Sequence, residues 1–138
     1  MSLSDYVLSP IGVIHSVLKR REDAPMQASE GAPDAWIEVE AAVTDGLSGI
    51  AMGDDLIVIT WLHRAHRDTL LTHPRNDKSQ ALRGVFATRS PDRPNPLGLH
   101  RVTVRTIEGN RMQVGPIEAI DGTPVVDIKP ALQRTTDY

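Results

Sequence analysis

The sequence predicts a mostly β fold, a small antiparallel barrel or sandwich with one or two short helices. Two observations favour this fold. Short runs rich in Val, Ile and Leu follow one another at close spacing, with turn residues between them. By contrast, only residues 44–54 have the features of a helix. The 138 residues are enough for a hydrophobic core, so we expect a single domain over residues 1–138.

The first half of the chain contains three predicted strands. Residues 9–18 (SPIGVIHSVL) are rich in Ile and Val. Residues 36–43 (WIEVEAAV) place Ile37 and Val39 on one side, which is typical of a half-buried strand. Residues 55–62 (DLIVITWL) form a continuous apolar run, so this strand is predicted to be buried on both faces.

The segments between these strands have a different character. Residues 20–35 (RREDAPMQASEGAPDA) are polar and rich in Pro, Gly and Ala, which predicts a long loop. Loops of this length in small domains are often functional. Residues 44–54 predict a short helix capped by Thr44 or Asp45. The residues expected to face inward from this helix are Leu47, Ile50 and Ala51.

The second half of the chain also reads as strands. Residues 83–89 (RGVFATR) predict a short strand. Residues 99–107 alternate, and after a Glu-Gly-Asn turn residues 111–117 return, which predicts a hairpin. Residues 123–130 (TPVVDIKP) predict a last short strand, and the tail 133–138 is expected to be loose.

Charge is unevenly distributed along the chain. The formal net charge is −3, which by itself argues against a nucleic-acid-binding protein. Residues 61–111, however, hold ten Lys and Arg against four Asp and Glu. This basic middle either forms a local site for an anion or is scattered over several faces.

The sequence contains no cysteine, no apolar span and no recognisable signal peptide, and these absences indicate a compartment. There are no cysteines, which excludes disulfides, thiolate chemistry and cysteine-bound zinc. No stretch approaches the about 20 apolar residues of a membrane span. The first ten residues carry Asp5 and lack the apolar centre of a signal peptide. We therefore expect a cytoplasmic protein.

A proline-rich segment at 89–97 separates two apolar runs. Pro91, Pro94 and Pro96 fix their own φ angles and restrict the residues before them. The segment therefore cannot be helical and is a poor central strand. A stiff loop of this kind suits the holding of a ligand, although a plain turn with solvated arginines is the alternative.

Histidines follow the predicted strand at 55–62. His63 and His66 are three residues apart and His73 is near, but no cysteine or pair of carboxylates accompanies them as metal ligands. We expect no metal site. The stretch 63–67 (HRAHR) is either a polar strand end or the mouth of a ligand pocket.

Two carboxylates near the end of the chain, Asp121 and Asp127, are candidate functional groups. Asp121 precedes Gly122, and such an aspartate most often caps its own turn. Asp127 lies in an apolar run, so it either faces solvent or is paired, with Lys129 or an arginine of the proline-rich segment as partners. The glycine patterns of dinucleotide-binding folds and P-loops are absent, as is the nucleophile elbow of hydrolases.

The stretches GVFATRSPDRPNPLGL and DGTPVVDIKP together resemble the signature pair of TrmO-type proteins, the tRNA threonylcarbamoyladenosine N6-methyltransferases. PIGVIHS and WLHR match other parts of that family, and the resemblance covers about residues 8–132. It implies a small β-barrel that forms homodimers, with S-adenosyl-L-methionine as cofactor and tRNA as substrate. Many members carry a further domain, so this chain looks like a short, single-domain member.

The resemblance also implies a cofactor pocket built from four segments. Arg89 would bind the methionine carboxylate and Glu118 the ribose hydroxyls or the amino group, while backbone groups near Gly115 would read the adenine edge. At Met26 the chain departs from the family, which usually has arginine there. The complete implied set is Met26, Gln27, Ala28, His63, Arg64, Arg89, Leu99, Gly115, Pro116, Ile117 and Glu118.

The implied reaction moves a methyl group to a nitrogen that also loses a hydrogen. Asp121 or Asp127 could assist as the base, and Arg93, Asn95 and Arg101 would lie nearer the tRNA. Two alternatives stay open. The same cofactor could serve another nucleoside or a small molecule, or the barrel could bind S-adenosyl-L-methionine without catalysis.

Overall fold

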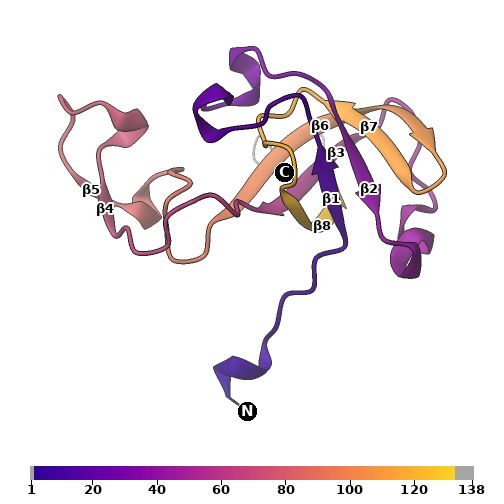
Figure 1. Ribbon diagram of the computed structural model, residues 1–138, viewed down its shortest axis with the longest axis horizontal. Helices are drawn as coiled ribbons and strands as arrows, with labels where there is room; N and C mark the ends of the chain where they lie inside the picture. Colours follow the sequence, from indigo (N-terminus) through magenta and orange to yellow (C-terminus); the bar gives the residue numbers. More distant parts are fainter. Residues whose placement is uncertain (1, 133–138) are drawn as a thin grey trace.

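Six antiparallel strands close into a barrel in the computed structural model, which describes residues 2–132 (Figure 1). Around the barrel the strands follow the order β1, β2, β7, β6, β3, β8, and β8 returns to β1. Their bounds are β1 Gly12–His15, β2 Ala35–Val39, β3 Asp55–Trp61, β6 Leu97–Glu108, β7 Arg111–Gly115 and β8 Pro124–Pro130. The predicted mostly β barrel is confirmed.

Alternation along the strands explains how the barrel is filled. In β2, Ile37 and Val39 are buried while Trp36 and Glu38 face outward, as predicted. The strand β3 is buried on both faces from Leu56 to Val58, also as predicted. Side chains from all six strands meet in one core: Ile14, Ala35, Ile37, Val39, Leu56, Val58, Val102, Val104, Met112, Val114 and Val125, joined by Ile117 and Ala119.

The longest complete strand pairing joins β3 to β6. All seven residues of β3 pair with β6, from Asp55 opposite Thr103 to Trp61 opposite Leu97. The strands β6 and β7 form the predicted hairpin, and Gly109 in its turn has a φ of 62°, which favours glycine. The strand β6 begins two residues before the predicted start, and β7 ends at Gly115 rather than at residue 117.

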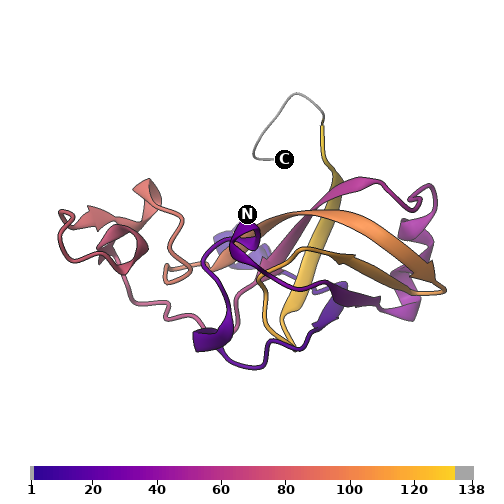
Figure 2. The same ribbon diagram turned by 90° about the horizontal axis from the view of Figure 1, so that it is seen from above.

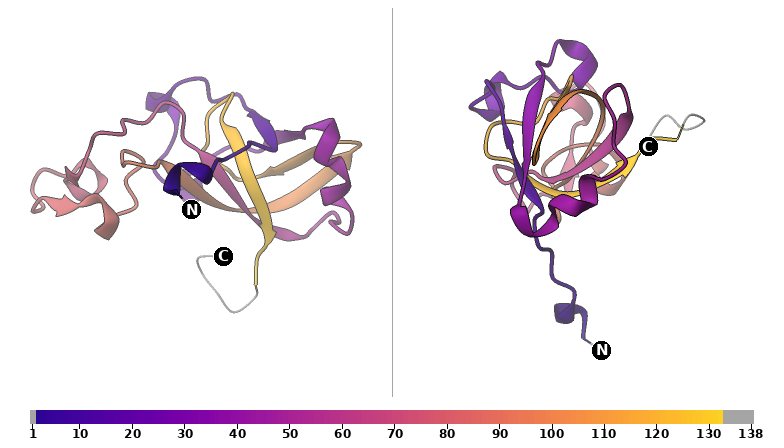
Figure 3. Two further views of the ribbon diagram at one scale, coloured as in Figure 1. Left: turned by 90° about the horizontal axis from the view of Figure 1, so that it is seen from below. Right: turned by 90° about the vertical axis from the view of Figure 1, so that its right-hand side faces the viewer.

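Three long connections emerge from the same end of the barrel. They join β1 to β2 (residues 16–34), β3 to β6 (62–96) and β7 to β8 (116–123). This end is called the long-loop end below. The 62–96 connection extends beyond the barrel as an arm, and the loop between β1 and β2 lies at its base (Figures 1 and 2). The right-hand view of Figure 3 looks along the barrel and shows its strands arranged in a ring.

Short elements decorate these connections. The arm carries the two-stranded sheet of β4 (Leu71–Thr72) and β5 (Arg83–Gly84). All helices within residues 2–132 are 3-10 helices, and the longest is η4. Their bounds are η1 Leu3–Asp5, η2 Arg21–Asp23, η3 Ala28–Glu30, η4 Ala41–Leu47, η5 Pro74–Asn76 and η6 Val85–Ala87.

Two predicted elements differ from the structure. The helix expected at 44–54 begins earlier, as η4, and ends at Leu47, because Gly49 and Gly53 adopt φ angles of 96° and 90° that no right-handed helix allows. Thr44 and Asp45 both lie inside η4, so neither caps it: Glu40 is the N-cap residue, and the Thr44 hydroxyl donates to the Glu40 carbonyl. Leu47 and Ile50 do pack against the core, but Ala51 is exposed.

The strand expected at 83–89 is mostly absent. Only Arg83 and Gly84 pair, with Thr72 and Leu71 of β4, and the chain then turns into η6. The first strand is also shorter than predicted: it ends at His15. The tail prediction for 133–138 lies outside the described residues. Among residues 2–132, no helix has the length and apolar character needed to cross a membrane.

Candidate functional site

The three connections at the long-loop end are tied to one another. The Asp121 N–H donates to the Leu18 carbonyl at 2.7 Å, and the Ile117 N–H donates to the Pro33 carbonyl at 2.9 Å. These bonds join 116–123 to 16–34. Arg21 joins the 16–34 connection to the arm, because its Nη1 donates to the Arg64 carbonyl at 3.4 Å. The long-loop end therefore has a defined arrangement of loops.

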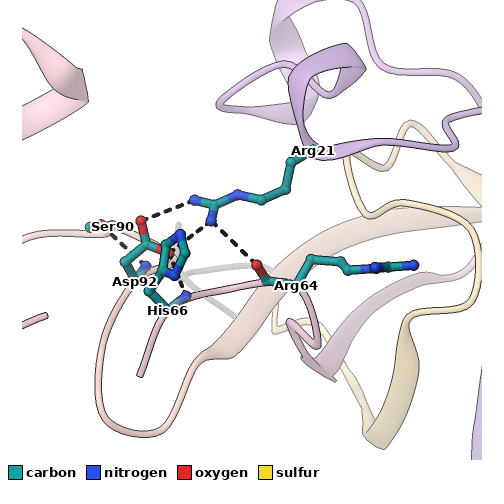
Figure 4. A network of polar contacts seen from close by, with 5 residues as sticks. All are labelled: Arg21, Arg64, His66, Ser90 and Asp92. Atoms are coloured by element: carbon teal, nitrogen blue, oxygen red, sulfur yellow. Dashed lines mark hydrogen bonds and ion pairs between the residues drawn. The ribbon is translucent and has the colours of Figure 1, made fainter. Parts of the chain in front are cut away.

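The proline-rich segment is held in place by side chains from neighbouring loops (Figure 4). Arg21 approaches Asp92 with two nitrogens, each 3.0 Å from a carboxylate oxygen. The same carboxylate accepts a hydrogen bond from the backbone N–H of His66 at 2.8 Å. Burial by itself raises the pKa of the Asp92 carboxyl, but the hydrogen bonds from Arg21 and His66 outweigh it and hold the pKa below its usual range. Asp92 is therefore a fixed anion that anchors this loop.

Arg67 fixes the other half of the segment. Its guanidinium lies over the Trp61 ring, 5.0 Å from the centroid. From there Nε donates to the Pro94 carbonyl at 2.7 Å and Nη2 to the Asn95 amide oxygen at 3.3 Å. The segment is thus the stiff, non-helical connection that the prolines predict, held by contacts on both sides.

The strand end at Gly115 is clamped by two side chains. A Cβ at Gly115 would lie 1.9 Å from the Asp34 Oδ1 atom, so only glycine fits there. Arg105 donates to the Gly115 carbonyl at 3.1 Å and pairs with Asp34 at 3.5 Å. Ile117 is fully buried in the core. The backbone from Gly115 to Ile117 is therefore fixed, and the Gly115 carbonyl and Ile117 N–H already have protein partners.

Glu118 is partly buried and reaches toward the barrel interior. Its Oε1 atom contacts His100 Nδ1. His100 Nε2 in turn lies 2.7 Å from the Thr60 hydroxyl. The His100 side chain is only 4% exposed and Glu118 20%. Thr60, His100 and Glu118 therefore form one polar chain at the long-loop end.

The Asp-Gly turn follows Glu118 in the same connection. Asp121 Oδ1 accepts the Ser16 N–H at 2.9 Å, and Oδ2 lies 3.3 Å from Lys19. The hydrogen bond from Ser16 lowers the Asp121 pKa, with Lys19 adding to the effect and partial burial opposing it. Asp121 therefore does not cap its own turn, as such aspartates most often do, but ties the turn to the first loop. Its lowered pKa makes it a charged but weak base.

His63 faces the same turn. Its Nε2 atom would lie 3.8 Å from a Cβ on Gly122. Partial burial, reinforced by the neighbouring Arg64 charge, lowers the His63 pKa below its usual value. At neutral pH the ring is therefore uncharged and can accept or donate one hydrogen bond.

Most of the sequence-predicted site residues lie at the long-loop end. Met26, Gln27 and Ala28 stand at the start of η3 in the first loop, with Met26 half exposed. Arg89 begins the proline-rich segment and is exposed. The Arg64 side chain extends away from the Asp92 cluster (Figure 4). Pro116 is exposed beside buried Ile117.

The residues expected to approach tRNA differ in position. Arg93 folds back, donating from Nη1 to the Thr88 and Ser90 carbonyls at 3.0 Å each. Asn95 is exposed but engaged by Arg67. Arg101 lies further along β6, opposite Ile57, with its Nη2 atom 3.6 Å from Asp55. Only the first two belong to the loops of the site.

Two other predicted residues lie on strands. Leu99 is exposed on β6 and paired with Ile59. Asp127 also pairs with Ile59, from β8, and contacts Lys129 at 3.3 Å, which was one of its expected partners. Both are about half exposed. Within residues 2–132, no three His, Asp or Glu side chains gather closely enough to hold a metal ion.

Sequence reasoning missed His100, Thr60, Arg21 and Asp92. A signal for His100 was present: in LHRVTV it shares the inward face with Val102 and Val104. A titratable residue on the apolar face of a strand needs a partner. The other contacts join residues far apart in the chain, such as Arg21 and Asp92, and no local pattern predicts them.

The chain is similar to known proteins over nearly its whole length. Residues 13–137 match the family described as tRNA-methyltransferase O N-terminal domain. An Archaeoglobus fulgidus protein named "S-adenosyl-L-methionine-binding protein" is 42% identical over 123 residues, covering 89% of this chain and 87% of its own. A second protein from that organism, named as a probable S-adenosyl-L-methionine-binding protein, is 45% identical over 123 residues. The match covers 89% of this chain but only 33% of that relative.

Solved structures agree with these matches. The crystal structure of TrmO from Pseudomonas aeruginosa superposes with a TM-score of 0.76 at 28% identity. The superposition covers 100% of this chain and 61% of that one. The chain therefore spans about three fifths of the length of this TrmO and a third of the longer Archaeoglobus relative.

Proposed function

The chain belongs to the tRNA-methyltransferase O N-terminal domain family, and on that premise we propose that it transfers a methyl group from S-adenosyl-L-methionine to N6 of threonylcarbamoyladenosine in tRNA. The observation that carries the proposal is the topology of the barrel. The two signature stretches are far apart in sequence, but both include residues of the loops at the long-loop end. There the proline-rich segment and residues 115–122 are both fixed by contacts with the first loop.

The donors at this end fit the proposed cofactor. Arg89 supplies a guanidinium suited to a carboxylate, and Glu118 supplies an acceptor suited to ribose hydroxyls or an amino group. His63, held uncharged at neutral pH, avoids a second positive charge near a sulfonium. The relatives named as S-adenosyl-L-methionine-binding proteins support this assignment.

The cofactor, when bound, supplies an already activated methyl group. The residues of the chain must align the acceptor nitrogen with that methyl and exclude water. The acceptor nitrogen must also lose its hydrogen, and Asp121 and Asp127 remain the candidate bases. Asp121 lies in a loop of the long-loop end whereas Asp127 lies on β8, but the low pKa of Asp121 makes it a weak base. Changing each to Asn should reduce the methylation rate while cofactor binding is retained; an unchanged rate removes that residue as the base.

Transfer RNA is the proposed partner because of the basic arm. The arm and the strand after it carry most of the ten Lys and Arg of residues 61–111. Arg64, Lys78 and Arg83 are exposed there. Phosphate contacts of this kind predict that tRNA binding weakens steeply as salt rises, whereas binding of a small acceptor would change little. A tRNA acceptor is consistent with the expected cytoplasmic location.

We also propose a homodimer in which the arm is covered by a second copy. Four apolar side chains of the arm are largely exposed: Leu70, Leu71, Leu82 and Phe86. Exposed apolar groups gathered on one extension are typical of an association surface. The two strands of the arm, β4 and β5, form only two pairs of residues, too few to be stable without further packing.

A second candidate function is binding of S-adenosyl-L-methionine without catalysis. The specific observation that favours it is that both candidate bases are engaged, Asp121 by Ser16 and Lys19 and Asp127 by Lys129. Methylation of another nucleoside or a small molecule is the remaining alternative. Cofactor binding with no turnover on any acceptor would identify the binding protein.

One assay separates these functions. The purified protein is mixed with S-adenosyl-L-methionine and threonylcarbamoyl-modified tRNA, and the digested nucleosides are weighed by mass spectrometry. A modified adenosine heavier by one methyl group is the expected product. The control is the same tRNA without the threonylcarbamoyl group, which should gain nothing. If the threonylcarbamoyladenosine gains no methyl group while calorimetry shows that the cofactor binds, the proposed reaction is overturned.

A further inference from the structure

A histidine is buried where the barrel core meets the long-loop end. His100 points inward from β6, in the same alternating series as the core residues Val102 and Val104. Its neighbour on β6, Gly98, leaves room for it: a Cβ there would lie 2.4 Å from the Thr60 hydroxyl and 2.6 Å from His100 Nε2. The fold thus makes a space for a polar contact inside an otherwise apolar barrel.

The hydrogen bonds that link Thr60, His100 and Glu118 run in one direction. The Glu118 carboxylate is an acceptor, so His100 Nδ1 must carry the hydrogen and donate it. In the neutral ring, Nε2 is then the acceptor and receives the hydroxyl hydrogen of Thr60. No buried side-chain nitrogen or oxygen of the described residues lacks a partner, so this arrangement satisfies all three groups.

The contact with His100 uses only one of the two carboxylate oxygens of Glu118. Oε1 is occupied by the imidazole, while no hydrogen bond joins Oε2 to another group of residues 2–132. The Glu118 side chain is 20% exposed, so part of it can be reached by a ligand at the long-loop end. An acceptor held this way has one orientation and loses little freedom when a ligand donates to it.

We infer that His100 is a positioning residue that holds the Glu118 carboxylate in place to accept a hydrogen bond from the adenosine part of S-adenosyl-L-methionine. This inference rests on the proposed function, because it takes Glu118 as a cofactor contact. His100 itself touches no part of the cofactor and acts only through Glu118. The Glu118 carboxylate fixes which ring nitrogen carries the hydrogen, and the Thr60 hydroxyl completes the arrangement by donating to the other nitrogen.

The test compares two amide replacements. Asn at position 100 places its amide nitrogen near the position of Nδ1 and can still donate to Glu118, whereas Gln reaches the position of Nε2 and cannot. S-adenosylhomocysteine is titrated by calorimetry into the wild type, His100→Asn and His100→Gln, after urea unfolding has shown that each variant is folded. We expect His100→Gln to bind about tenfold more weakly and His100→Asn to stay within about threefold of wild type.

A double variant distinguishes positioning from general stability. If His100 acts through Glu118, adding His100→Gln to Glu118→Gln should weaken binding no further, because the oriented group is already gone. Nitrogen NMR of the free wild type should also show hydrogen on Nδ1 and not on Nε2 of His100. Hydrogen on Nε2, additive losses, or equal binding by His100→Gln and wild type would each overturn the inference while leaving the proposed cofactor intact. Absence of binding by the wild type would instead refute the proposed function, and this role of His100 with it.

Discussion

Arg21 and Asp92 connect the first loop to the proline-rich segment through two parallel contacts. The distances are 3.0 Å from Nη1 to Oδ1 and 3.0 Å from Nη2 to Oδ2 (Figure 4). Such two-pronged pairs fix geometry as well as distance. The pair couples the loop that carries Met26, Gln27 and Ala28 to the segment that begins at Arg89. This ion pair is therefore one of the contacts that set the relative position of two of the proposed cofactor segments, and the pair of Arg75 and Glu30 is another between the arm and the first loop.

Replacing Arg21 with Met should weaken cofactor binding without unfolding the barrel. Both side chains are partly exposed, so the loss in stability should be about 1 kcal/mol or less. Misplacement of the two loops should raise the dissociation constant of S-adenosylhomocysteine about threefold to tenfold, measured by calorimetry. Asp92→Asn should have a similar effect, because it removes the same pair.

The neighbouring Arg20 offers a matched control for this prediction. Its partners, Glu22 and Asp23, belong to the same loop, so it joins no two segments. Arg20→Met should bind S-adenosylhomocysteine as the wild type does. Equal weakening in the Arg20 and Arg21 variants would mean that charge alone, and not the loop connection, matters.

Asp121 should make the folded protein sensitive to acid. Its pKa is lower in the folded than in the unfolded chain, mainly because of the Ser16 N–H. The unfolded chain therefore binds this proton more readily. The stabilisation is complete above the ordinary aspartate pKa of about 3.9 and is lost as pH falls through the lower folded value. Asp121→Asn should be less stable than the wild type at pH 6 and should lose less stability between pH 5 and pH 3.

Thermal unfolding across this pH range measures the difference. Asp45→Asn is the control, because Asp45 is an exposed carboxylate on η4. Its stability should follow the wild type at every pH. A wild-type and an Asp121→Asn curve that run parallel below pH 5 would show that the Ser16 contact contributes nothing to the pH dependence.

Local patterns were enough to predict the barrel strands. Ile37 and Val39 alternate with polar neighbours, and residues 99–115 alternate across a Gly-containing turn, so burial and hairpin pairing both follow from period two. The prediction at 83–89 was wrong because only Val85 is buried and the arm offers a single short partner strand. Strand propensity without a neighbouring strand does not produce a strand.

The site was only partly predictable, and the reason is its long-range contacts. Family signatures placed Glu118 and Arg89 in the loops, but Glu118 is held by His100, which lies on another strand. The clamp of Asp34 and Arg105 around Gly115 likewise joins three separate segments. Contacts of this kind depend on barrel closure and register, which a single sequence does not specify.

Gly98→Ala should disrupt the polar chain from within the barrel. The added methyl would lie 2.4 Å from the Thr60 hydroxyl, 2.6 Å from His100 Nε2 and 3.1 Å from Leu62 Cδ2. These neighbours are enclosed, so we expect a loss of about 1–3 kcal/mol in the free energy of unfolding, measured in urea. Gly84→Ala is the control, because nothing lies within 4 Å of a Cβ there. An equal change in both variants would show that the cost is conformational and not steric.

Phe86→Asp should separate the proposed dimer into monomers. Phe86 is 79% exposed on the arm, and Leu70, Leu71 and Leu82 surround the same two short strands, so a buried charge there would oppose association. Analytical ultracentrifugation should give twice the chain mass for the wild type and the single mass for the variant. Met52→Asp tests an equally apolar position at the opposite end of the barrel, 66% exposed, and should remain dimeric. A wild type that sediments as a monomer at all concentrations, or a Phe86→Asp dimer, would show that the arm is not the interface. Because the arm also carries the proline-rich segment, loss of the dimer should weaken S-adenosylhomocysteine binding only if the second copy completes the site.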